Sequence, residues 1–165
     1  MKISEKMVKR LSEQVNMEWY SAYLYYQMAL DADAAGLPGM SYWLKQQTKE
    51  EIEHGERIME YVMERRDHCT LDAIDKPEFK WESPLKTMQA ALEHEELVTA
   101  SIHKLVEEAR EEKDWATVSM LQWFVDEQVE EEDTCETWID AFEGAGDNAA
   151  AIYMVDRGMG KREEE

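Results

Sequence analysis

Helix-breaking residues gather at a few places in this chain and are nearly absent between them. Among 165 residues there are only three prolines and seven glycines. Apart from Gly55, they fall at Gly36 to Gly39, at Pro77 and Pro84, at Gly144 and Gly146, and at Gly158 and Gly160. Because proline and glycine interrupt helices, the long segments between them are free to be helical. We expect helices over about 4–35, 38–66, 83–112 and 114–142, and a short fifth helix over 147–157.

The lengths of the connections predict how these helices are arranged. The links after 35 and after 112 are short, and short links join antiparallel neighbours. The segment 67–82 is different: about sixteen extended residues reach ~53 Å, enough to return along a helix of ~42 Å. We therefore predict an all-α fold, a four-helix bundle with one long crossover, as a single domain over 1–165. Apolar residues should pack the crossover against the bundle or a neighbouring subunit: Leu71, Ile74, Phe79 and Trp81.

The charge of the chain limits its partners. Its 38 acidic and 18 basic residues give a formal net charge of −20. Such a charge repels nucleic acid and anionic lipid and attracts cations, although it would also serve simply to keep a protein soluble. The sequence has no run of about 18 apolar residues, no signal-peptide pattern at its start, and two cysteines without metal-binding spacing. We expect a cytoplasmic protein with no nucleic-acid or membrane partner.

Each long segment carries an apolar seam at helical spacing, and each seam becomes polar near its middle. The first seam is Val8, Leu11, Val15, Glu18, Ala22, Tyr25 and Ala29. The second is Met40, Leu44, Gln47, Glu51, His54, Ile58 and Tyr61. The third is Met88, Ala91, Glu95, Val98, Ile102, Leu105 and Ala109. The fourth is Leu121, Phe124, Gln128, Glu131, Cys135, Trp138 and Phe142. Mid-helix positions meet at one level of a bundle, so the polar residues should converge in the core.

A buried cluster of carboxylates needs positive charge nearby. An unpaired carboxylate in a core costs several kcal/mol or takes up a proton. A set of carboxylates with one imidazole and no thiolate suits a pair of iron, manganese or zinc ions. Glu51 and His54 stand one helical turn apart and can bind the same ion. Since Glu51-x-x-His54 is the one such motif in the chain, we expect the two metal positions to be unequal.

The sequence resembles the non-haem ferritins of bacteria and archaea along essentially its whole length. The resemblance is carried by Asn16-Met17-Glu18-Trp19-Tyr20-Ser21 with Tyr25, by Glu50-Glu51-Ile52-Glu53-His54, and by Leu121-Gln122-Trp123 followed by Glu127-Gln128-x-Glu130-Glu131-Glu132. It implies a ferritin-like bundle that stores iron and oxidises Fe(II) to Fe(III) with oxygen or hydrogen peroxide.

The resemblance also implies roles for individual residues. Glu18, Glu51 and His54 would bind a first iron, and Glu51 and Glu95 a second. Gln128 would lie near the second iron and the oxidant, and Tyr25 would act beside the site as hydrogen-bond partner or electron donor. A third iron site adjoins in bacterial members, and it would use a further set of side chains here: Glu50, Glu127, Glu130 and Glu131.

A hollow shell of 24 identical subunits that holds ferric mineral is a further implication of the resemblance. The chain departs from related proteins in two ways. Val118 and Leu121 are apolar where animal ferritins carry the acidic lining of the three-fold channel, which questions iron entry by that route. Gln128 replaces a second Glu-x-x-His motif, which argues against bacterioferritin and rubrerythrin, and no residue is a candidate haem ligand.

Two other functions compete with iron storage. One is a peroxide-consuming di-iron enzyme of rubrerythrin type without its rubredoxin domain. The other is a non-enzymatic acidic bundle that binds cations or a basic partner through its surface, because a single Glu-x-x-His on an acidic helix is more often a surface pair. The histidines at 68, 94 and 103 are expected to face solvent or subunit contacts.

Overall fold

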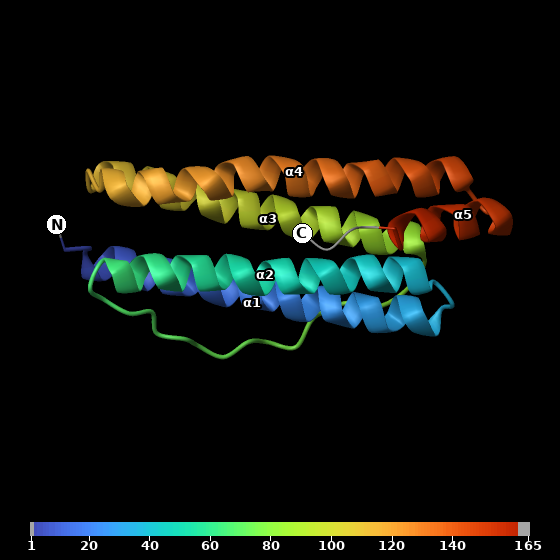
Figure 1. Cartoon of the computed structure of the whole chain (residues 1–165), viewed down its shortest axis with the longest axis horizontal. Coiled ribbons are helices and arrows are strands. Elements are labelled where there is room, and N and C mark those ends of the chain that lie inside the picture. The colour runs from blue at the N-terminus through green and yellow to red at the C-terminus, as the bar shows by residue number, and fades with distance from the viewer. Residues whose placement is uncertain (1, 162–165) are drawn as a thin grey trace.

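Five helices make up the described part of the chain. The computed structural model describes residues 2–161, in which the helices are α1 (Glu5–Ala34), α2 (Pro38–Glu64), α3 (Pro84–Glu111), α4 (Trp115–Ala145) and α5 (Ala149–Met159). The predicted all-α four-helix bundle with a short fifth helix is confirmed (Figure 1). The predicted single domain over 1–165 includes residues 1 and 162–165, which lie outside the described residues. Across residues 2–161, each helix is too short or too polar to cross a membrane.

Local sequence explains where the helices begin and end. Ser4 and Ser83 accept hydrogen bonds from backbone N–H groups three residues later, and Pro84 occupies a first-turn position. The fourth helix runs past the expected end at 142, because Gly144 is tolerated inside it. The chain breaks instead at Gly146, whose φ of 53° suits glycine.

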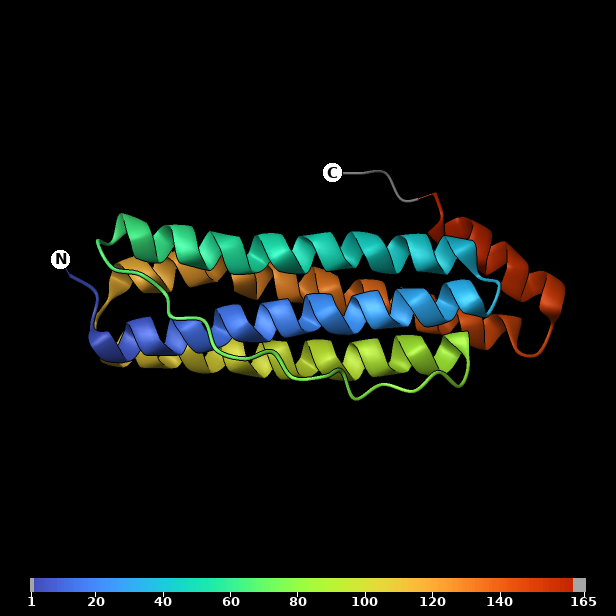
Figure 2. The same ribbon diagram turned by 90° about the horizontal axis from the view of Figure 1, so that it is seen from below.

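The long crossover lies along the outside of α1 (Figure 2). Asn16 on α1 holds it by donating to Ala73 O at 3.0 Å and accepting from Asp72 N at 3.2 Å. Phe79 and Trp81 pack against the core as expected, whereas Leu71 and Ile74 are exposed in the single chain. The crossover therefore joins two hairpins, α1 with α2 and α3 with α4, into one bundle.

The apolar core is divided into two clusters. One contains Leu24, Met28 and Leu44, and the other contains Leu11, Ile58 and Ile102, each with its neighbours. A belt of buried polar side chains lies between them at mid-height: Glu18, Glu51, His54, Glu95, Gln128 and Glu131. The seams predicted from the sequence are buried throughout except at Val8, Tyr61 and Trp138, which are partly buried. The bundle thus places its polar interruptions together, as expected.

The fifth helix docks against the beginning of α2. The residue before α2, Leu37, provides no side-chain cap; instead the buried carboxylate of Asp156 on α5 accepts a hydrogen bond from Met40 N at 2.8 Å. Gly39 allows this approach, because a Cβ there would lie 1.9 Å from the carbonyl oxygen of Asp156. Asp156 therefore serves as a cap supplied from another helix.

We predict that Asp156→Ala loosens α5 while the four long helices stay folded. Loss of a helix cap typically costs ~1 kcal/mol. Hydrogen exchange of α5 amides should accelerate at least several-fold, whereas Asp156→Asn, which keeps an acceptor oxygen, should exchange more nearly as the parent does. Asp140→Ala, which removes an exposed acid from α4, is the control. Unchanged exchange in α5 of Asp156→Ala would show that the cap does not hold this helix.

Candidate metal centre

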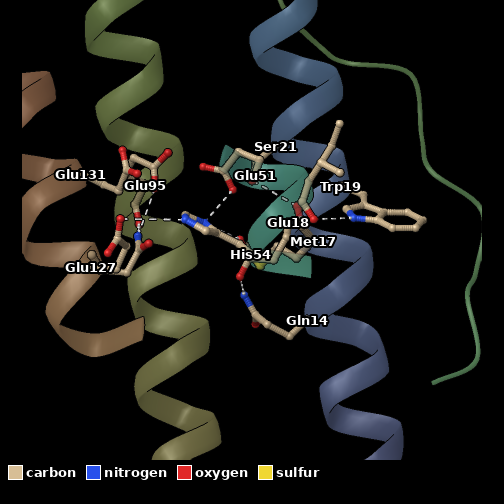
Figure 3. Close-up of polar contacts among 12 residues, drawn as sticks. Gln14, Met17, Glu18, Trp19, Ser21, Glu51, His54, Glu95, Glu127 and Glu131 are labelled. Carbon is tan, nitrogen blue, oxygen red and sulfur yellow. Dashed lines mark hydrogen bonds and ion pairs between the residues drawn. The ribbon is translucent and has the colours of Figure 1, made fainter. Parts of the chain in front are cut away.

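Two helices bring the first ligand group together. Glu18 comes from α1, and Glu51 and His54 come from adjacent turns of α2. His54 Nδ1 lies 3.9 Å from Glu18 Oε2 and 3.5 Å from Glu51 Oε2. One ligand atom from each residue falls within 4.8 Å of the others, as a single bound ion requires (Figure 3). The family resemblance implied the same three residues for a first iron, and the structure brings their ligand atoms together; that they bind iron remains a prediction.

The chemistry of this group fits a cation. Glu18 and Glu51 are each 1% exposed, and their Oε2 atoms are buried without a hydrogen-bond partner. Burial raises the pKa of Glu18, and it raises the pKa of Glu51 well above its ordinary value, because each carboxylate loses water and Glu51 also faces neighbouring acids. A divalent ion would supply the missing positive charge and accept both oxygens.

Gln14 orients Glu18 and was missed by the sequence analysis. Its amide Nε2 donates to Glu18 Oε1 at 2.8 Å, and its own Oε1 accepts a hydrogen bond from Ser101 on α3. This leaves Glu18 Oε2 directed at His54 and Glu51. Gln14 stands four residues before Glu18 on the same helix face, so a search for polar residues one turn from each predicted ligand would have found it.

Glu95 lies on the opposite side of the belt and is held by neighbouring side chains. Tyr25 donates its hydroxyl hydrogen to Glu95 Oε1, and Gln128 Nε2 donates to Glu95 Oε2 at 3.0 Å. Burial raises the pKa of Glu95 to about 7, although these two hydrogen bonds oppose the shift. Tyr25 and Gln128 thus meet Glu95 directly, and their contact with a metal ion remains a prediction.

A second ligand group begins on the other nitrogen of the same histidine. His54 Nε2 lies 3.9 Å from Glu127 Oε1, and His54, Glu127 and Glu131 form another set within 4.8 Å. Gln47 Nε2 donates to Glu131 Oε2 at 2.7 Å, which positions that carboxylate. Burial raises the pKa of Glu131 well above its ordinary value, and Glu95 and Glu50 add to the effect. His54 therefore stands between two acidic groups.

The second group opens onto a cavity between α2 and α4. This cavity has a volume of about 410 Å³. It is lined by the four glutamates predicted for a third metal position, Glu50, Glu127, Glu130 and Glu131, together with aromatic residues including Trp43 and Trp138. Among these four carboxylates Glu131 is buried, Glu50 and Glu127 are partly buried and Glu130 is exposed, and Lys161 lines the same cavity.

The structure groups the predicted ligands differently from the sequence analysis in one respect. Glu95 was expected beside Glu51 as a second-iron ligand, but neither close group of three among residues 2–161 includes it. Its oxygens are directed to Tyr25 and Gln128 instead. The pairing of Glu95 with Glu51 on one ion remains a prediction.

One expectation about the histidines is wrong. His68 and His103 are exposed, but His94 is buried and its Nε2 lies 2.7 Å from Ser21 Oγ. Burial lowers the pKa of His94 to about 4. The prediction that His94 is a surface residue fails because His94 lies beside the third seam and not on it. The seam pattern predicts buried apolar positions but not polar contacts between α1 and α3.

Close packing fixes the imidazole of His54. Trp123 and Phe124 on α4 approach its ring edge-on, at centroid distances of 5.4 and 6.1 Å. The next residue, Gly55, admits the Trp19 indole, which a Cβ would meet at 2.5 Å. The two ring contacts from α4 restrict the orientation of the His54 imidazole.

Comparison with known proteins gives a consistent set of relatives. A family model described as the ferritin-like domain matches residues 8–145. A bacterial non-heme ferritin from Staphylococcus epidermidis is 38% identical over 160 residues, covering 97% of this chain and 96% of the relative. A bacterial non-heme ferritin from Staphylococcus aureus is 37% identical over the same lengths.

Solved structures show the same similarity in three dimensions. An open-pore ferritin from the hyperthermophilic archaeon Archaeoglobus fulgidus superposes with a TM-score of 0.96 at 42% identity, covering 99% of this chain and 100% of that one. An engineered closed form of the Archaeoglobus fulgidus ferritin gives 0.97 at 43% identity with the same coverage. Fold and sequence therefore agree over nearly the whole chain.

Proposed function

The chain belongs to the ferritin family of iron-storage proteins, and on that premise we propose that its buried acidic belt is a ferroxidase centre for two iron ions. The observation that carries this proposal is that one buried carboxylate oxygen of Glu18 and one of Glu51 lie beside His54 without any hydrogen-bond partner. A stable core does not keep such a pair without a cation or a proton between them.

The residues of the first group would bind Fe(II) and favour its oxidation. Glu18 and Glu51 supply negative charge, and His54 supplies a neutral nitrogen ligand oriented by its aromatic neighbours. Hard, anionic oxygen ligands stabilise Fe(III) more than Fe(II), so this site lowers the reduction potential of the bound iron. Each pair of Fe(II) ions gives two electrons to oxygen, which leaves with two protons as hydrogen peroxide. Two further Fe(II) ions give that peroxide two electrons, and with two more protons from water it becomes two molecules of water.

A second iron would bind between Glu51 and Glu95, and the four cavity glutamates would receive iron as it leaves. Gln128 and Tyr25 hold Glu95 in place for this purpose. The cavity begins at Glu127 and Glu131, next to His54, and continues to Glu50 and Glu130. This order of carboxylates supports a path from the oxidation site toward stored ferric mineral.

We further propose that the chain assembles into a shell of 24 identical subunits in the cytoplasm and carries no haem. Similar structures described as an open-pore ferritin and as an engineered closed form support a hollow assembly. Of the two positions compared with the animal three-fold channel, Leu121 is fully buried in the core, so it lines no channel. Iron entry is better sought at other residues.

The test begins with metal-free protein. Fe(II) is added without oxygen, air is then admitted, and absorbance near 300–400 nm is followed while light scattering measures the particle. We expect rapid oxidation of about two irons per chain on a particle of ferritin-shell size. Further Fe(II) should then enter the particle as ferric mineral.

Other outcomes separate the competing functions. Rapid peroxide turnover with an external reductant and no mineral would replace the storage function with a rubrerythrin-like enzyme. Slow autoxidation by a monomer or dimer would remove the ferroxidase proposal and favour an acidic bundle that binds cations through its surface.

A further inference from the structure

A short chain of hydrogen bonds ends at one ligand of the proposed first iron. The hydroxyl of Ser101 on α3 donates to Gln14 Oε1 at 2.5 Å, and Gln14 Nε2 donates to Glu18 Oε1 at 2.8 Å. Gln14 and Glu18, both on α1, are 2% and 1% exposed, and Ser101 is partly buried. The hydrogen bonds therefore connect a residue of α3 with a ligand that α1 carries.

The order of donors and acceptors fixes the orientation of the Gln14 amide. An ionised carboxylate only accepts hydrogen bonds, so the amide must turn its NH₂ group toward Glu18. This orientation leaves the amide oxygen facing Ser101, whose hydroxyl supplies the hydrogen. The reversed amide would set its oxygen against the Glu18 carboxylate, which is costly for buried groups. Ser101 therefore keeps the Gln14 amide hydrogen-bonded at both ends.

The bond from Gln14 gives the two oxygens of Glu18 different roles. Oε1 is occupied as an acceptor, whereas Oε2 is buried and has no hydrogen-bond partner within the described part of the chain. Oε2 lies 3.9 Å from Nδ1 of His54, which forms the first ligand group with Glu18 and Glu51. A rotation of the carboxylate that moved Oε2 away from His54 would also break the bond to Gln14. Gln14 thus directs a single oxygen of Glu18 to the ion position.

Packing alone does not explain an amide at this position. The neighbours of Gln14 on α1, Leu11 and Val15, belong to an apolar cluster of the core. A leucine would fill nearly the same space without the cost of taking an amide out of water. The buried amide therefore points to a role in the polar belt.

The bond from Ser101 also relates the two proposed ion positions. α3 supplies none of the three residues of the first ligand group, but it carries Glu95, the proposed ligand of the second iron. Tyr25 on α1 donates to Glu95, so α1 and α3 are hydrogen-bonded at both Glu95 and Ser101. Ser101 thus ties the helix that holds one ion position to a ligand of the other.

We propose that Gln14 and Ser101 act together as positioning residues for the first iron. Ser101 holds the Gln14 amide, and the amide presents Glu18 Oε2 to the ion. The inference rests on the proposed ferroxidase function and deepens it with two residues that supply no ligand atom themselves. It requires that the effect of Ser101 passes through Gln14 and that it falls on one of the two ion positions.

The experiment uses Co(II) as the probe. Gln14→Leu removes the amide, Ser101→Ala removes the hydroxyl that holds it, and Ser101→Thr keeps a hydroxyl. A further variant combines Gln14→Leu with Ser101→Ala. Gln122→Leu is the matched control, because Gln122 Nε2 donates to Asp126 Oδ1 at 3.0 Å with the same four-residue spacing but on an exposed surface. Calorimetry and visible absorbance follow Co(II) binding to each metal-free protein without oxygen, and thermal unfolding checks the fold.

Gln14→Leu should weaken one of the two Co(II) binding steps ~10–100-fold, the range typical for residues behind a metal ligand, and should weaken the other step far less. Ser101→Ala should weaken the same step by a smaller factor, whereas Ser101→Thr and Gln122→Leu should bind Co(II) as the parent does. The double variant should match Gln14→Leu, because Ser101 acts through Gln14. In Fe(II) oxidation by Gln14→Leu, the Fe(II) concentration that gives half the maximal rate should rise more than the maximal rate falls.

Three outcomes would overturn the positioning role while leaving the ferroxidase centre in place. They are parental Co(II) binding in Gln14→Leu, equal weakening of both steps, and a double variant weakened by the product of the two single effects. If Gln14→Leu does not fold, parental Co(II) binding in Ser101→Ala overturns the role in its place. A parent that binds no pair of Co(II) ions and oxidises Fe(II) slowly would instead overturn the ferroxidase centre.

Discussion

Exchange of Glu51 for glutamine should slow the oxidation of the first two Fe(II) ions per chain at least tenfold while the helical fold remains intact. Glu51 Oε2 lies 3.5 Å from His54 Nδ1, closer than Glu18 Oε2 at 3.9 Å, and in the proposed centre Glu51 would contribute to both iron positions. Glutamine has nearly the same shape but offers one neutral oxygen. Because changes even to residues behind a metal ligand typically cost ~10–100-fold in affinity or activity, loss of a ligand charge should have at least that effect.

The matched control for this substitution is Glu53→Gln. Glu53 lies on the same helix but is exposed to solvent, so the net charge changes equally and the site does not. Stopped-flow absorbance measures the rate, and circular dichroism checks the helices. Parental oxidation rates in both Glu51→Gln and His54→Ala would remove these residues from the proposed centre.

Stability and metal binding, measured together on the Glu51 variant, distinguish a buried ferroxidase centre from cation binding at the acidic surface. Replacing Glu51 should stabilise the metal-free protein near neutral pH in either case, because the folded state no longer has to bury this carboxyl group as a charge or take up a proton to neutralise it. If the belt is the metal site, the same substitution must also reduce bound metal. A gain in stability with metal binding unchanged would favour binding through the acidic surface.

The metal-free protein should lose stability as the pH rises from 6.5 to 8.5. Burial raises the pKa of all four belt carboxylates, Glu18, Glu51, Glu95 and Glu131, above an ordinary value of 4.5, and that of Glu95 to about 7. The folded state therefore holds protons that the unfolded chain has released. Stability from these groups is fully present below their ordinary value and is lost as the pH rises through the folded values.

The pH range is chosen to avoid the titration of His94, whose shifted pKa changes stability with pH in the opposite direction to the carboxylates. The pKa of His94 is lowered by burial from 6.5 to about 4, so its contribution changes only below 6.5. Thermal unfolding measured in steps from pH 6.5 to 8.5 with a metal chelator should give a falling melting temperature. A flat or rising profile would show that the belt does not carry buried acid in the metal-free state.

A redox-inert divalent ion should reverse this loss. Zn(II) would bind the deprotonated carboxylates, so its stabilising effect should grow with pH over the same range. At a free concentration a hundredfold above Kd, binding contributes ~2.7 kcal/mol, or a rise of ~5–10 °C for a chain of this size. Glu51→Gln should show a much smaller rise than Glu53→Gln.

The seam pattern predicted most of the fold because it follows directly from helical periodicity. Residues three or four apart share one face of a helix, so Glu18, Glu51, His54 and Glu95 could be assigned to the core before any coordinates were known. The crossover followed from chain length alone. The end of the fourth helix was predicted too early, at 142, because Gly144 was expected to break the helix. The sequence does not show which of two nearby glycines, Gly144 or Gly146, adopts a positive φ.

The parts of the site that escaped prediction depend on how individual side chains are oriented in the folded bundle. Gln14 lies off the chosen seam, and its role becomes visible only when Glu18 accepts its hydrogen bond. The orientation of Glu95 toward Tyr25 and Gln128 depends on side-chain rotamers, which periodicity does not determine.

The division of the core into two apolar clusters limits the routes by which an ion can reach the polar belt. The two apolar clusters, one on each side of the belt, block ion movement along the long axis of the bundle, because an ion entering either cluster would lose its hydration without compensation. The acidic cavity, lined by α2, α4 and the end of α5, instead adjoins the belt at Glu127 and Glu131. In the proposed shell, iron would therefore move across the bundle and not along it, and the helix ends would remain available for contacts with other molecules.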